Sequence, residues 1–175
     1  MKNTWRSVIA IITLALAMSP LAGAGELKIA TVDRVKVTKE CQAGKKATAT
    51  LQEYAKVRQK VVASEEADLV KMSEDYSKQA AVLSPEARKD KEETFNQKRV
   101  AFQRRSTELE REVQDKRQEL AMIFNQQLDD VVKAIAEKEK FSLVLDSSPG
   151  TQTLYSNSAI DITDRVIKEM DKASK

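Results

Sequence analysis

The sequence of 175 residues predicts an α+β protein in which a long antiparallel α-helical hairpin, a coiled-coil arm, projects from a small β body. Three observations predict this fold. The segment 44–138 is dominated by Ala, Glu, Lys, Gln and Arg, and its one strong interruption is Ser84-Pro85. Short segments of strand-like composition flank it on both sides. Aromatic residues make up 5% of the chain and charged residues 33%, a balance typical of long solvated helices.

The first 24 residues are predicted to be a cleaved signal peptide, outside the fold. Lys2 and Arg6 precede an uncharged apolar run at 8–18, and small residues lead up to Ala24. The run is too short to span a bilayer, which needs about 20 residues. A retained membrane anchor is the alternative interpretation. Cleavage after Ala24 predicts that the mature chain is exported.

Composition excludes several classes of function. The chain has no His and one Cys, so triads with a His base, most zinc sites and iron–sulfur clusters are excluded. Its four Gly residues form no phosphate-binding loop. The sequence therefore predicts no catalytic residue, metal site or cofactor. Removal of the leader leaves 28 cations against 27 anions, which argues against a nucleic-acid-binding protein.

The β body is predicted from 25–43 and 139–175. Strands are expected at 27–33 and 141–146, because both segments are short and rich in apolar or β-branched residues. Residues 148–151 (Ser-Pro-Gly-Thr) suit a type II turn, which predicts a return strand at 153–156. Asp161 is a plausible N-cap for a last helix. One face of that helix carries Ile162, Val166, Ile167 and Met170.

The arm is predicted as two helices, 44–83 and 85–138. Ser84 is a good N-cap, Pro85 fits the first helical position, and a residue before proline disfavours helix. A helix of this length extends roughly 60 Å, and so short a turn makes the two helices antiparallel. Apolar residues at a spacing of three and four form a thin seam. The seam comprises Leu51, Tyr54, Val61, Leu69, Met72, Tyr76, Leu83, Phe95, Phe102, Leu109, Val113, Leu120, Phe124, Val131 and Ile135.

The second helix is expected to overhang the first over 125–138 and to pack on the small sheet. So few strands make a marginal core with open edges, and oligomerisation would correct both. We therefore expect the strands of several chains to complete one body. The residues expected in it are Ile29, Val32, Leu143, Val144, Leu145, Leu154, Ile162 and Val166.

The segment 94–107 is the candidate binding surface, because it has four cations, apolar residues and no acid. It could bind an acidic lipid head group, a nucleic acid or an unfolded chain. Alternatively, its cations pair with the acids of 61–74, which the register places opposite. The arm as a whole carries 18 cations and 18 anions across 46–138. The candidate residues are Met72, Tyr76, Phe95, Lys98, Arg99, Phe102, Arg104 and Arg105.

Cys41 stands immediately before the first long helix. In an oxidising compartment a lone thiol could form a disulfide between chains. The alternative is a small residue that serves only the helix entry.

The order of short motifs resembles the Skp/OmpH family of periplasmic chaperones across almost the whole mature chain. The motifs are Lys28-Ile29-Ala30-Thr31-Val32-Asp33, Ala43-Gly44-Lys45-Lys46-Ala47, Leu143-Val144-Leu145-Asp146, Leu154-Tyr155-Ser156 and Asp161-Ile162-Thr163. The resemblance implies a homotrimer whose β body carries three helical tentacles around a cavity. It also implies an ATP-independent holdase for unfolded outer-membrane β-barrel proteins.

One departure from the family concerns charge. Well-known members have strongly basic tentacles that draw in clients and bind lipopolysaccharide, whereas the charges of this arm balance. The balance weakens the expectation of lipopolysaccharide or membrane-surface binding. The main rival function is an exported structural or adaptor coiled coil that binds a folded envelope partner.

Overall fold

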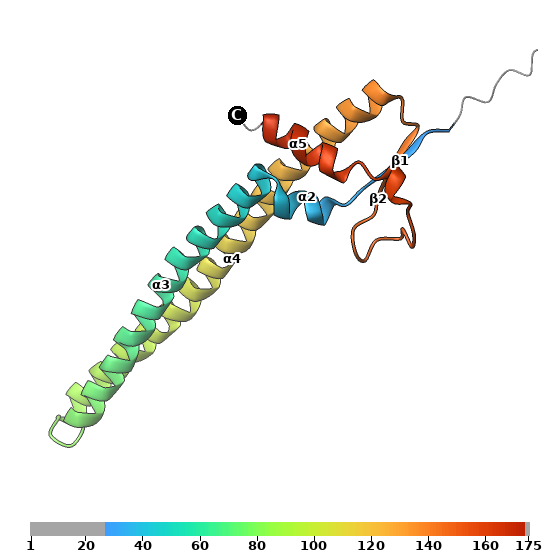
Figure 1. Cartoon of the computed structure of the whole chain (residues 1–175). Helices are drawn as coiled ribbons and strands as arrows, with labels where there is room; N and C mark the ends of the chain where they lie inside the picture. Colours follow the sequence, from blue (N-terminus) through green and yellow to red (C-terminus); the bar gives the residue numbers. More distant parts are fainter. Residues whose placement is uncertain (1–26, 174–175) are drawn as a thin grey trace, which may run out of the picture.

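The computed structural model describes residues 27–173, and the predicted signal peptide lies outside them. Two long antiparallel helices form an arm, and shorter elements gather at one end of it as a small body (Figure 1). The α+β fold class is thus confirmed. The elements are β1 (Ile29–Val32), α2 (Arg34–Glu40), α3 (Gln42–Gln79), α4 (Pro85–Glu139), β2 (Leu143–Asp146), η1 (Ser158–Ile160) and α5 (Thr163–Ala173).

The sheet consists of β1 and β2, which pair in parallel from Ile29 opposite Leu143 to Val32 opposite Asp146. Parallel strands need a long crossover connection, and here the whole arm supplies it. Ala30 and Val32 are buried in the core, whereas Leu143 and Leu145 remain 46% and 40% exposed. The two-residue period of a strand explains why one face of β2 is left open.

The predicted return strand at 153–156 is wrong. The turn before it forms as expected, with Gly150 at φ 88° and a hydrogen bond from Thr151 N to Ser148 O. The hydroxyls of Thr151 and Thr153 then donate to the main-chain oxygen of Asp146. These side-chain bonds hold the segment as a loop, and no strand forms over 153–156.

Helix α2 was not predicted, because Val35, Val37 and Thr38 are β-branched residues in a short segment. Its N-cap is Asp33, a residue type that sequence reasoning can recognise as a cap. Asp33 Oδ1 accepts a hydrogen bond from Lys36 N at 2.8 Å. Cys41 separates α2 from α3, is fully buried, and its Sγ accepts from Gly44 N at 3.3 Å. Its role is therefore at the helix entry, and within this chain its thiol is not accessible for a disulfide.

Gly44 allows the close approach of α3 to α2. A Cβ at this position would lie 2.0 Å from Thr38 O, a main-chain atom that no side-chain rotation can move away. The glycine therefore fixes the angle at which the arm leaves the body.

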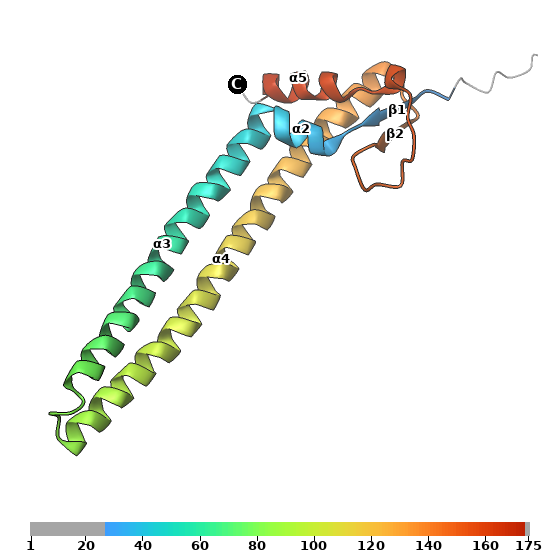
Figure 2. The same ribbon diagram turned by 60° about the horizontal axis from the view of Figure 1, so that its bottom comes forward.

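The arm is formed by α3, of 38 residues, and α4, of 55 residues, which run side by side over the length of α3 (Figure 2). The lengths correspond to about 57 Å and 82 Å. Ser84 Oγ caps α4 by accepting from Ala87 N, and Pro85 occupies the first turn as predicted. Helix α3 ends at Gln79, four residues before the predicted end, since 80–83 tighten into the turn at the tip.

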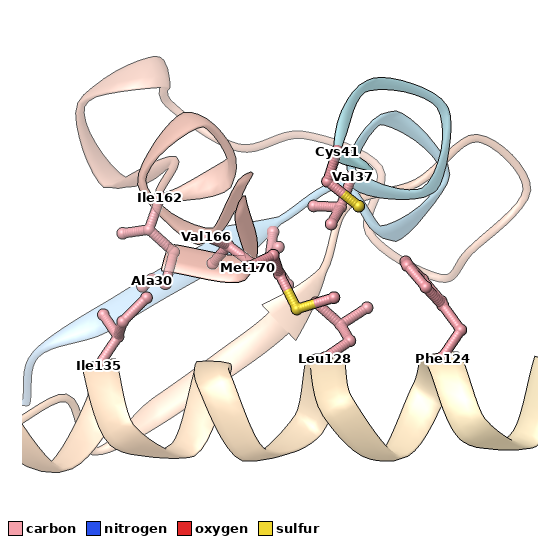
Figure 3. Packing of buried hydrophobic residues seen from close by; sticks show 10 residues of the cluster. Ala30, Val37, Cys41, Phe124, Leu128, Ile135, Ile162, Val166 and Met170 are labelled. Atoms are coloured by element: carbon pink, nitrogen blue, oxygen red, sulfur yellow. The ribbon is translucent and has the colours of Figure 1, made fainter. Parts of the chain in front are cut away.

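The core lies where the overhanging end of α4 meets the small elements. Figure 3 shows Phe124, Leu128 and Ile135 projecting from one side of α4 toward α2, α5 and the sheet. Leu128 is 1% exposed, and Val131 and Val132 pack against the same cluster. The predicted packing of the overhang is confirmed.

Helix α5 closes the core with the predicted face, since Ile162, Val166 and Met170 are buried and Ile167 packs against them. Asp161 caps the helix although it lies one residue before the N-cap position. Its Oδ1 accepts a hydrogen bond from Thr163 N at 2.8 Å. Arg165 N and Val166 N bond to Ile162 O. No helix within residues 27–173 is long and apolar enough to cross a membrane.

Candidate functional site

Two adjoining grooves follow the seam between α3 and α4 on one face of the arm. The groove nearer the tip, of about 540 Å³, lies between Met72 and Tyr76 on α3 and Phe95 on α4. The next groove, of about 570 Å³, lies between Leu69 on α3 and Phe102 on α4. We call them together the distal grooves. Their shared wall of Asp68 and Lys98 makes them one continuous surface.

Seven of the eight candidate binding residues line the distal grooves. They are Met72, Tyr76, Phe95, Lys98, Phe102, Arg104 and Arg105. Arg99 lines neither groove. Lys98 and Arg99 are about 100° apart around α4, and Arg99 lies outside the grooves, whereas the equally adjacent Arg104 and Arg105 both line the larger one. The structure therefore brings the apolar candidates and three of the four cations together and leaves Arg99 apart.

The aromatic residues of the distal grooves are half-buried, and so are Leu69 and Met72. The seam residues predicted along both helices are all buried or half-buried. Leu109, at 3% exposure, is the fully buried one among those between 51 and 120. The seam thus holds the helices together while it leaves part of each apolar side chain accessible from the groove.

Tyr76 fixes the register near the tip. Its hydroxyl donates to Glu92 Oε1 at 2.6 Å, and this hydrogen bond raises the pKa of the Tyr76 phenol. Lys91 Nζ donates to Gln79 Oε1 at 2.6 Å one turn further on. Both contacts cross between α3 and α4, and they agree with the predicted placement of 94–107 opposite 61–74.

The charges of the distal grooves are mixed. Lys98, Arg104 and Arg105 share the larger groove with Glu65, Asp68 and Glu108. Arg105 pairs with Glu108 of its own helix at 3.0 Å, and not with the acids of α3. Lys98 and Arg104 form no ion pair within residues 27–173. The hydrogen bond to Glu108 is the largest cause that raises the pKa of Arg105, and the charge of Glu65 on α3 adds to it across the seam. These cations therefore form no direct ion pair across the seam, Arg105 is attracted to α3 at longer range, and the surface is not basic.

The clearest polar contact across the seam was missed from the sequence. Arg58 pairs with Glu112 at 3.1 Å, and its guanidinium lies 3.5 Å from the centre of the Tyr54 ring. Arg58 follows Leu51 by seven residues and precedes Val61 by three, so it occupies a seam position. A cation at a seam position is the sequence signal that could have predicted this contact. Along the arm the contact lies between the distal grooves and the body, and neither residue lines those grooves.

The residues predicted for the oligomeric body divide into two sets. Val32, Ile162 and Val166 are buried within the single chain, and Val144 packs against them. Ile29 is half-buried, while Leu143, Leu145 and Leu154 are exposed, Leu154 at 99%. Tyr155, 85% exposed, belongs with the exposed set and was not predicted. The body therefore leaves apolar side chains of β2 and of the loop after it without cover.

No group of three or more His, Cys, Asp or Glu side chains within residues 27–173 could hold a metal ion. The distal grooves have apolar centres and charged rims.

Known proteins match both the sequence and the fold. A family described as outer membrane protein (OmpH-like) matches residues 28–170. An uncharacterized protein of Aquifex aeolicus is 26% identical over 172 residues, which cover 98% of this chain and all of that protein. A crystal structure of an OmpH-like protein from Caulobacter crescentus, described as a candidate outer membrane chaperone, superposes with a TM-score of 0.76 at 20% identity. That superposition covers 83% of this chain and 84% of the other, and it shows the shared fold. The family match spans most of the chain, which therefore belongs to the OmpH-like family.

Proposed function

We propose that the protein is an ATP-independent periplasmic holdase, which binds unfolded outer-membrane β-barrel proteins and prevents their aggregation. The observation that carries the proposal is the pair of distal grooves, in which half-buried aromatic and aliphatic side chains lie open along the arm. Membership of the OmpH-like family supports the same function. The predicted signal peptide supports its place in the periplasm.

The mechanism follows from how the arm is built. Small apolar surfaces separated by charges bind a chain segment weakly, and many such contacts together retain an unfolded protein without selecting one conformation. Release then needs no nucleotide, because a client that folds into the membrane buries the same apolar residues more completely.

We also propose that the protein is a homotrimer. A two-stranded sheet is marginal by itself, and the exposed Leu143, Leu145 and Leu154 would become buried if strands of other copies joined the body. Three arms around one cavity would surround a client from several sides.

The test is light-scattering mass after size exclusion of the mature chain, 25–175. The protein is measured alone and after dilution of a urea-unfolded outer-membrane barrel protein into it without ATP. We expect three protomers alone and a soluble complex of three protomers with one client. A monomer, or a client that precipitates at the same rate with and without the protein, would refute the proposal. A complex that forms only with a folded envelope protein would support the adaptor function instead.

A further inference from the structure

A third groove lies where the arm meets the body, and its charges differ from those of the distal grooves. This root groove, of about 460 Å³, lies between α3 and α4. Its apolar lining includes Ala43, Ala47, Leu120, Ile123 and Phe124. None of its lining residues in the described chain is acidic, whereas each distal groove has three carboxylates in its wall.

Helix geometry places the root groove on the same face of the arm as the distal grooves. On α4, Ile123, Lys116, Arg105 and Lys98 are separated by 7, 11 and 7 residues. At 3.6 residues per turn, separations of 7 and 11 return to nearly the same direction. A chain segment that follows this face from the tip therefore reaches the root groove last, beside the body.

Ile123, which lines the root groove, is 50% exposed, and the preceding Met122, which does not line it, is 70% exposed. They are the one adjacent pair of large exposed apolar side chains on α3 and α4. The other large exposed apolar residues of the arm, such as Val57 and Val100, stand singly along the helices.

The floor of the root groove is part of the buried core. Phe124 lines it and is also buried in the core at 7% exposure (Figure 3). The neighbouring Leu128 is held in the same cluster. A side chain that enters this groove therefore packs on a surface that the body has already ordered, which reduces the entropic cost of binding.

The rim of the root groove is cationic. Lys46 is exposed, lines the groove, and forms no ion pair within residues 27–173. The first turn of α3 contains no acid, and the N-terminal end of a helix is positive. The Asp171 carboxylate offsets that positive end, because its Oδ1 accepts from Gln42 N at 2.7 Å. Lys46 is therefore the charge that the groove itself supplies.

We propose that the root groove docks an apolar side chain of an unfolded client segment that carries a carboxylate beside it. The apolar side chain packs between Ile123 and Phe124, and the carboxylate lies near Lys46. This inference rests on the proposed holdase function and specifies which client sequences the arm prefers near the body.

The test uses two fluorescein-labelled peptides of 12 residues with the same alternating Leu, Phe and Ser. They differ only in whether Asp or Lys follows each apolar residue, and their affinity for the mature protein is read by fluorescence anisotropy. We expect the Asp peptide to bind about threefold more tightly, the effect typical of one exposed ion pair. Equal binding of both peptides would overturn the proposal.

Matched variants locate the contact. Ile123→Ser should weaken the Asp peptide about tenfold. Val100→Ser, which removes an exposed side chain that lines none of the three grooves, should change it less than about twofold. Lys46→Glu should abolish the preference for Asp, whereas Lys45→Glu, at an exposed neighbour outside the groove, should leave it. Circular dichroism verifies that each variant is folded.

Two further outcomes would overturn the proposal. Unchanged peptide affinity in Ile123→Ser with a changed light-scattering mass would assign the groove to a contact between copies. Equal weakening by Ile123→Ser and Val100→Ser would mean that exposed apolar area alone determines binding. The barrel-protein assay with wild-type protein separates this inference from the holdase proposal. If the client stays soluble while the peptides do not discriminate, only the root-groove inference fails.

Discussion

The body and the arm use apolar residues in opposite ways. Ten buried apolar residues form one cluster in the body, from Ala30 to Met170 along the chain. The arm beyond Phe124 has one fully buried seam residue, Leu109, although its apolar residues recur at the same helical spacing. In the body, elements pack on the core from several directions, whereas in the arm each of the two helices covers only one side of the other. Apolar periodicity therefore indicates contact, and the number of covering elements decides burial.

The largest effect on stability is expected when a side chain in the core of the body is truncated. Leu128→Ala removes a side chain that is 1% exposed where α4 meets the small elements. The free energy of unfolding should fall by about 3 kcal/mol, because the surrounding elements cannot collapse into the cavity. Urea unfolding followed by circular dichroism measures it, at one protein concentration to hold any self-association constant. A loss below about 1 kcal/mol would mean that the body is packed as loosely as the arm.

Acid should destabilise the body before the arm. Burial raises the pKa of Asp146, but hydrogen bonds from the Oγ and main-chain N of Ser148 outweigh it and lower that pKa. Hydrogen bonds from Lys36 and Lys172 lower the pKa of Asp164 and Glu169. A lowered pKa in the folded state stabilises the fold above the unfolded value near 3.8, and the contribution disappears as pH falls through the folded pKa.

The acid dependence is measured as the urea midpoint at pH 6, 5, 4 and 3. Wild type should lose stability below pH 4, and Ser148→Ala should lose less on the same descent because the donors that favour the Asp146 carboxylate are reduced. Asp130→Asn, which removes an exposed carboxylate from α4, is the control and should follow wild type. If Ser148→Ala retained the full acid slope, the Asp146 contacts would not be its source.

A smaller effect is expected in the arm. Leu109→Ala removes its one fully buried side chain, but Leu109 lines a further groove between α3 and α4, of about 830 Å³, from which water can enter and fill the space. The global free energy of unfolding should fall by about 1 kcal/mol or less. Hydrogen exchange should accelerate in the middle of α3 and α4 and remain unchanged in β1 and α5. Loss of protection in the body as well would show that the two regions unfold together.

The smallest effect is expected at the polar contact across the seam. Arg58 and Glu112 are 27% and 34% exposed, so their attraction is partly screened. A double-mutant cycle with Arg58→Met and Glu112→Gln should give a coupling of about 0.5 kcal/mol. The Arg111–Asp115 pair, more exposed and within one helix, is the matched comparison and should couple less. A coupling above about 2 kcal/mol would mean that this ion pair contributes strongly to the stability of the arm.

The long helices and their pairing could be predicted because their signals are local. Ser84 and Pro85 define the turn, and counting from them gives the register that the Tyr76–Glu92 contact confirms. The distal grooves follow from that register. Which of the four cations line the grooves was decided by the structure, because the adjacent Arg104 and Arg105 share a groove whereas the adjacent Lys98 and Arg99 do not.

The failures lie in the body, where neighbouring segments decide the outcome. Helix α2 has β-branched residues, yet it is held as a helix by Asp33 and by its packing on α3 at Gly44. The segment 153–156 has strand composition, yet the hydroxyls of Thr151 and Thr153 hold it as a loop on Asp146. In both cases a contact from outside the segment outweighs a propensity of a few tenths of a kcal/mol per residue.

The sequence by itself determined the hairpin, its turn and the strip of apolar residues along it, because helix periodicity, capping and proline act within a few residues of the chain. Only the tertiary structure decided that β1 and β2 pair in parallel, that Cys41 is buried at a helix entry, and that Ile123 stays open while Phe124 is covered. These outcomes depend on which elements approach from far along the chain, and burial is a property of that assembly.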